Sequence, residues 1–158
     1  ESKSQEEPMS GRVIVGVDGS ETARKAVRWA AREAKLRGMK LELVSAWEIP
    51  TYSYVSGYGF PAISEEMMKS LTTRAEGHLA EALDEARAEA REVQIETIAA
   101  EGQPAKVLVE VAKGANLLVV GSRGLGGFRE LLLGSVSQQC AQHATCPVVI
   151  VRHLEERA

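Results

Sequence analysis

The chain has 158 residues, of which 44% are hydrophobic, and 19 basic against 22 acidic residues give a net charge of −3. This size fits one domain with a single core, and nothing in the charge suggests the basic face that binding to nucleic acid needs. Apolar runs fall short of the roughly 20 residues of a membrane span, and residues 1–10 are too acidic for a secretory signal. We therefore expect a disordered leader over 1–10, then one cytoplasmic domain over 11–158, away from membranes.

The first half of the chain alternates strand patterns with helix patterns. β-Branched and apolar runs predict buried strands, and residues that suit helix caps mark where the intervening helices begin and end. The predicted elements are a strand over Arg12–Val17, a helix between Ser20 and Gly38, a strand over Leu41–Ala46, a tyrosine-containing connection over Trp47–Ile63 (Tyr52, Tyr54, Tyr58), and a long helix from Ser64.

The second half continues the same alternation. Its predicted elements are a strand over Val93–Ala99, a helix from Pro104 to Gly114, a strand over Leu117–Val120, a helix over Ser135–His143, and a strand over Pro147–Val151. Strands that alternate with helices imply a parallel sheet with helices on both faces. The fold class is therefore α/β, with one open parallel sheet of five strands.

Residues 121–135, GSRGLGGFRELLLGS, contain five glycines directly after the fourth predicted strand. Ligands of open α/β sheets bind beyond the carboxyl ends of the strands, where the strand order reverses. Glycines there let backbone N–H groups point at an anion, and the N-terminus of the next helix attracts phosphate. The residues concerned are Gly121, Arg123, Gly124, Arg129, Gly134, Ser135 and Ser137. A flexible loop that binds nothing is the alternative.

The spacing Gly121-x2-Gly124-x9-Gly134-Ser135 resembles the nucleotide-binding signature of the universal stress protein family. The segments VGVDGSETARKAVRWA, EGQPAKVLVEVA, LLVVGSRGLGG and TCPVVIVR resemble successive parts of that family, so that the resemblance covers about residues 11–152. It implies a strand order of 3-2-1-4-5 and the branch of the family that binds ATP.

The resemblance also implies a site for ATP, with any Mg²⁺ held through the phosphates. Gly16, Val17, Asp18 and Ala46 would line the adenosine end, where Asp18 would hydrogen-bond near the ribose. Gly121, Arg123, Gly124, Gly134, Ser135 and Val136 would hold the phosphates. Simpler roles stay open for two of these residues, Asp18 as a turn residue and Ala46 as a core residue.

The implied function is that of a nucleotide-dependent regulator of the stress response. The family commonly forms homodimers through the last strand, where Val148, Val149, Ile150 and Val151 would otherwise leave an apolar edge exposed. No general base or metal–carboxylate cluster is evident, and Ser135 lacks a histidine placed to activate it. The three histidines lack the spacing of a zinc site, and Cys140 and Cys146 are expected to be reduced. We therefore expect no catalysis beyond slow hydrolysis of ATP.

Other functions of an α/β sheet fit less well, with one exception. An ATP-pyrophosphatase or adenylating enzyme would carry an SGGxDS-like loop after strand one, where this chain reads DGSET from Asp18. A phosphoacceptor receiver domain needs an aspartate at the end of strand three, where Ala99 and Ala100 are expected. The exception, a protein-interaction module that binds no nucleotide, stays open.

Overall fold

The computed structural model describes residues 11–50, 63–123 and 133–152. The tyrosines of the connection, together with Gly124 and Arg129, lie outside these residues. The described elements are β1 (Arg12–Gly16), α1 (Glu21–Arg37), β2 (Lys40–Trp47), α2 (Glu65–Glu89), β3 (Ile95–Glu101), α3 (Pro104–Val111), β4 (Leu117–Gly121), α4 (Ser135–His143) and β5 (Val148–Val151).

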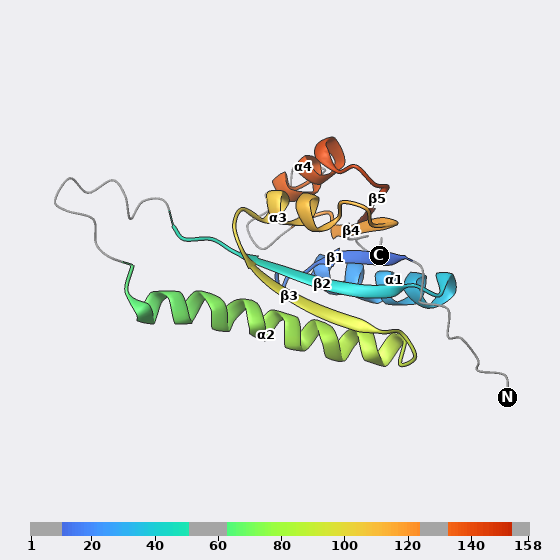
Figure 1. The fold of residues 1–158 in the computed structure, drawn as a ribbon, viewed down its shortest axis with the longest axis horizontal. Coiled ribbons are helices and arrows are strands. Elements are labelled where there is room, and N and C mark those ends of the chain that lie inside the picture. Colours follow the sequence, from blue (N-terminus) through green and yellow to red (C-terminus); the bar gives the residue numbers. More distant parts are fainter. Residues whose placement is uncertain (1–10, 51–62, 124–132, 153–158) are drawn as a thin grey trace, which may run out of the picture.

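The five strands form one parallel sheet in the order β3-β2-β1-β4-β5, which confirms the predicted fold class and strand order. Figure 1 shows α2 below the sheet and α3 with α4 above it. α1 packs on the same face as α2. The chain moves outward from β1 to β2 and β3, then returns to β4 on the other side of β1. The strand order therefore reverses between β1 and β4.

Side chains alternate between two cores across the sheet, as the geometry of a strand requires. Val13 and Val15 of β1 face the core beneath α1 and α2, whereas Ile14 faces the core beneath α3 and α4. The central strands β1 and β4 are buried along most of their length, but all four residues of β5 are partly exposed. β5 is thus an edge strand, and its side away from β4 pairs with no other described strand.

The predicted helix caps are confirmed at α1 and α2. The hydroxyl of Ser20 accepts a hydrogen bond from the Ala23 N–H, and Ser64 caps α2 through the Met67 N–H. Gly38 ends α1 in the left-handed conformation, at a φ of 63° that a glycine adopts without steric cost. Local side-chain chemistry therefore fixes where these helices start and where α1 stops.

The prediction for the third strand was wrong by two residues at each end. The Val93 N–H donates to the Ala90 carbonyl in a turn that follows α2, so the strand begins only at Ile95. It then continues to Glu101, which lies opposite Trp47 of β2. The other strand ends differ from the prediction by at most one residue, and α3 ends at Val111 rather than Gly114.

The later end of β3 also changes the argument against a receiver domain. That argument used Ala99 and Ala100 as the end of the strand, whereas Glu101 ends it. The topology excludes the receiver fold on firmer ground, because receivers have the strand order 2-1-3-4-5 and this sheet has β2 between β1 and β3.

Candidate functional site

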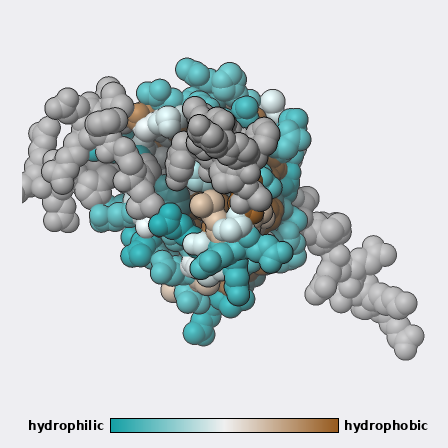
Figure 2. Space-filling model, turned by 90° about the vertical axis from the view of Figure 1, so that its left-hand side faces the viewer, coloured by the Kyte–Doolittle hydropathy of each residue, from teal (hydrophilic) through white to brown (hydrophobic). Residues whose placement is uncertain are grey.

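A cavity of about 100 Å³ lies at the carboxyl ends of β1, β2 and β4. Figure 2 looks onto this end of the molecule and shows less polar residues gathered at the centre, with hydrophilic residues around them. The cavity lies where the strand order reverses, which is the position expected for a ligand in an open α/β sheet.

Most of the described residues predicted to bind a nucleotide line this cavity. They are Gly16, Val17, Asp18, Ala46, Gly121, Arg123 and Val136, which come from four different parts of the chain. Six further residues line it that the sequence did not single out: Ser20, Ala23, Val44, Pro104, Leu108 and Val120. The structure therefore brings the two ends of the predicted site together around one space.

The walls of the cavity are mainly apolar. Val44 and Leu108 belong to the core beneath α3 and α4 and reach the cavity from β2 and α3. Leu108 packs closely on Gly16, where an added Cβ would lie 3.0 Å from Leu108 Cδ1. Apolar side chains therefore line this end of the cavity, and such a lining suits an apolar part of a ligand.

Asp18 is a turn residue and a cavity residue at the same time. Its Oδ1 accepts hydrogen bonds from the Ser20 N–H at 2.9 Å and from the Ser20 hydroxyl at 2.5 Å. These bonds hold the turn that leads into α1. Oδ2 receives no hydrogen bond from a described residue, so that one oxygen of the carboxylate is left to accept a donor from a ligand.

Gly121 is required by the packing of β4 against α1. A Cβ at this position would lie 2.8 Å from the carbonyl carbon and from the hydroxyl oxygen of Thr22. Just beyond it, the Thr22 hydroxyl donates a hydrogen bond to the Arg123 carbonyl. This contact fixes the backbone of Arg123 beside the first turn of α1.

The two ends of segment 124–132 are joined by hydrogen bonds. The Gly134 N–H donates to the Ser122 carbonyl at 2.7 Å, and the Ser137 hydroxyl bonds to both the Ser122 and Gly134 carbonyls. Ser137 is 2% exposed and does not line the cavity, so its hydroxyl serves this junction. We call these three residues the loop junction.

Gly134 and Ser135 lie at the start of α4 and do not line the cavity themselves. The first turn of α4 has no side-chain cap, and Ser135 is exposed. The N–H groups of an uncapped first turn are available to other acceptors, including an anion. Val136, on the same turn, reaches the cavity.

Metal and thiol chemistry add little to the described part of the chain. It contains no group of three or more histidine, cysteine, aspartate or glutamate residues that could hold a metal ion. Cys140 and Cys146 are free, and burial raises the pKa of the Cys140 thiol to about 11.

Of the helices in the described residues, none is long and apolar enough to cross a membrane.

Known proteins resemble this chain over nearly all of its length. The model of the universal stress protein family matches residues 9–152. The chain is 35% identical over 148 residues to universal stress protein YxiE of Bacillus subtilis, covering 91% of this chain and 100% of that protein. It is 37% identical to universal stress protein Rv2623 of Mycobacterium tuberculosis, covering 92% of this chain but 46% of that longer protein.

A solved structure described as a universal stress protein in complex with cAMP superimposes with a TM-score of 0.66. It is 31% identical and covers 92% of this chain and 98% of its own. The matched region includes β1, β4 and the segments on both sides of the loop junction. Fold, motif order and family model agree, and the chain belongs to the universal stress protein family.

Proposed function

We propose that this protein binds ATP in the cavity at the carboxyl ends of β1, β2 and β4, and acts as a nucleotide-dependent regulator of the stress response in the cytoplasm. One observation carries the proposal. Residues predicted for the adenosine end, such as Asp18 and Ala46, share a single cavity with Gly121 and Arg123, which were predicted for the phosphate end.

The chemistry of the cavity suits each part of the ligand. The apolar walls at Val44 and Leu108 suit the adenine ring, and Oδ2 of Asp18 suits a ribose hydroxyl. The uncapped N-terminus of α4 and the Arg123 side chain suit the phosphates, through which Mg²⁺ would be held. The structural neighbour in complex with cAMP supports an adenine nucleotide as the class of ligand.

Binding rather than turnover is the activity that we propose. The described residues around the cavity include no histidine, and Asp18 already accepts two hydrogen bonds within its own turn. A regulator needs only that its nucleotide-bound and nucleotide-free states present different surfaces to a partner. The alternative is a protein-interaction module of the same fold that binds no nucleotide.

Calorimetric titration with Mg-ATP tests the proposal, after any co-purified nucleotide has been stripped and identified. We expect wild-type protein to bind with a Kd of about 1 µM to 100 µM. Gly124→Glu places a negative charge in the glycine-rich segment and should abolish binding. Gly77→Glu is the matched control, because an added side chain at Gly77 meets nothing within 4 Å on the exposed side of α2.

Two results would contradict the proposal. Stripped wild-type protein that binds neither ATP nor another adenine nucleotide would favour the interaction module. Equal binding by wild type and Gly124→Glu would move the nucleotide away from the glycine-rich segment. A second variant, Ala46→Phe, fills the cavity from β2 and distinguishes loss of the base pocket from loss of the phosphate site.

A further inference from the structure

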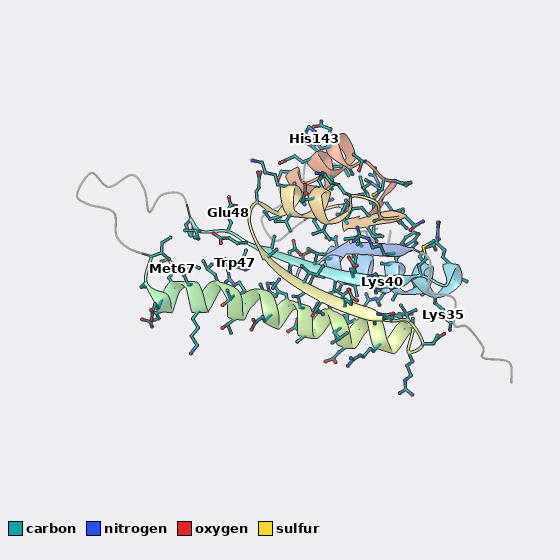
Figure 3. All side chains as sticks on the ribbon, in the orientation of Figure 1. Lys35, Lys40, Trp47, Glu48, Met67 and His143 are labelled. Atoms are coloured by element: carbon teal, nitrogen blue, oxygen red, sulfur yellow. The ribbon has the colours of Figure 1, made fainter. Side chains whose placement is uncertain are left out.

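A second cleft, of about 220 Å³, lies on the other face of the sheet between the end of β2 and the N-terminal half of α2. It meets the nucleotide cavity only at Asp18 and Ala46, which line both. Figure 3 shows Trp47 at this position, between β2 and α2. The proposed function makes no use of the second cleft.

The second cleft contains polar groups within a layer that is otherwise apolar. The buried residues of α2 are Ala75, Leu79, Ala82 and Ala86, and most of them pack on the sheet. At the second cleft, Arg74 and His78 of α2 and Ser45 of β2 lie beside the apolar residues Leu71 and Ala75. Arg74 and His78 are four residues apart on a helix, so they lie on the same face, one turn from each other.

These polar groups have no partners among the described residues. Neither Arg74 nor His78 makes a hydrogen bond or an ion pair there, whereas Arg28 and Arg32 of the neighbouring α1 pair with glutamates of α2 and Lys35 pairs with Glu92 just after it. Ser45 also lines the cleft, and its hydroxyl makes no hydrogen bond to the described part of the chain.

The polar and charged groups of the second cleft are divided between its two walls. The α2 wall carries Arg74 and His78, and the strand wall carries the carboxylates of Asp18 and Glu48. Trp47 adds a planar aromatic surface to the strand wall. A ligand that suits both walls needs an acidic group for the cationic side, a hydrogen-bond donor for the carboxylates, and a flat ring for Trp47.

We propose that the second cleft binds a small aromatic acid that also carries a hydroxyl or amino group. The acid group pairs with Arg74 and His78, and the Ser45 hydroxyl donates a further hydrogen bond to it. The ring lies against Trp47, and its donor group faces Glu48. The volume of the cleft restricts the ligand to a single ring with short substituents.

Tryptophan fluorescence gives a direct test, because the chain has two tryptophans and Trp29→Phe leaves only Trp47. Titration with para-hydroxybenzoate should change Trp47 emission saturably, with a Kd of about 1 mM or below. Arg74→Gln should weaken binding about tenfold or more, since it removes a charge-assisted hydrogen bond. Arg87→Gln, an exposed arginine on the same helix outside the cleft, should leave binding unchanged.

Phenol and benzoate, which each lack one of the two polar groups, should bind more weakly than para-hydroxybenzoate. The absence of saturable binding, or equal binding by Arg74→Gln and Arg87→Gln, would overturn the proposal. Ligand-observed NMR on the wild-type protein repeats the test without the Trp29 substitution. Mg-ATP titration of Arg74→Gln should match wild type, because Arg74 does not line the nucleotide cavity, so failure of one proposal is distinguishable from failure of the other.

Discussion

Gly121 shows at the scale of a single residue that one glycine can serve packing and ligand binding together. The sequence suggested that it frees the backbone for an anion. The structure adds that no side chain fits between the end of β4 and the first turn of α1. Loss of nucleotide binding in a Gly121 variant would therefore not show direct contact with phosphate, which is why Gly124 is the better position to test.

We expect Gly121→Ala to destabilise the protein by about 1–3 kcal/mol, because the added methyl group overlaps the Thr22 backbone and forces α1 to shift. Urea denaturation measures the difference. Gly77→Ala is the control, since it adds the same group to an open helical position and should stabilise by about 0.5–1 kcal/mol. Similar stability of wild type and Gly121→Ala would show that the close contact is relieved at no cost.

The two thiols should differ in reactivity. The pKa of Cys140 is raised to about 11, first by burial and then by the nearby Cys146, whose own pKa is also raised by burial. The thiolate is the reactive form, so alkylation of native Cys140 should be slow at neutral pH and accelerate only as the pH approaches 11. Iodoacetamide labelling read by mass spectrometry should modify the more exposed Cys146 first. Preferential labelling of Cys140 would contradict the burial of that side chain.

Residue patterns predicted part of the site and could not have predicted all of it. Asp18 and Gly121 follow strands directly, so their place at the carboxyl edge could be predicted from the sequence. Leu108 and Pro104 come from a helix that only the tertiary packing places over the cavity. Ser137 matched an anion-binding pattern, but its hydroxyl is used by the loop junction.

At the scale of elements, the continuous apolar runs of β1 and β4 made these strands easy to predict, because strands buried on both faces have no alternation to misinterpret. β3 was misplaced because Val93 is apolar and buried although it belongs to the turn after α2. β3 is a strand because its backbone pairs with β2 as far as Glu101. The side-chain pattern of the sequence does not indicate this pairing.

Helices α1 and α2 are joined by a series of ion pairs. Arg24, Arg28, Arg32 and Lys35 of α1 pair with Glu81, Glu85, Glu89 and Glu92 at the other helix and just beyond its end. Single exposed pairs contribute about 0–1 kcal/mol, but a series along one interface also sets the register of the two helices.

We expect Arg28→Glu to destabilise the protein by about 1 kcal/mol at low salt, because it places two carboxylates at the site of a 3.1 Å ion pair. The loss should shrink in about 1 M salt, where charges are screened within about 3 Å. The double variant Arg28→Glu with Glu85→Arg should recover most of the stability in urea denaturation. Arg87→Glu, which has no partner among the described residues, provides the comparison.

At the scale of the whole molecule, we propose that two copies pair through β5. Its four residues are all partly exposed, and hydrogen bonds to β4 use only one side of the strand. The carbonyls of Pro147 and Val151 face β4, so the backbone groups of Val148 and Ile150 point outward. An open apolar edge of this kind is normally covered, and a second copy would cover it by antiparallel pairing.

Ile150→Pro tests this assembly, because proline removes an outward N–H while leaving the bonds to β4 in place. We expect the wild-type protein to sediment as a dimer and Ile150→Pro as a monomer in analytical ultracentrifugation. Thr97→Pro on the opposite edge strand, β3, should remain dimeric. A monomeric wild type, or a dimeric Ile150→Pro variant, would remove β5 as the interface.

Because of the loop junction, the sequence of the glycine-rich segment should be able to change without loss of the fold. Its ends are held together by the Gly134–Ser122 hydrogen bond and by Ser137, whatever lies between them. Closing a longer loop costs only about 0.6 kcal/mol for each doubling of its length, so a change in the length of the segment should cost the scaffold little stability. Changes there can create, retune or erase a ligand specificity without a new fold having to evolve. Such a scaffold can therefore diversify in function while its stability is conserved elsewhere in the chain.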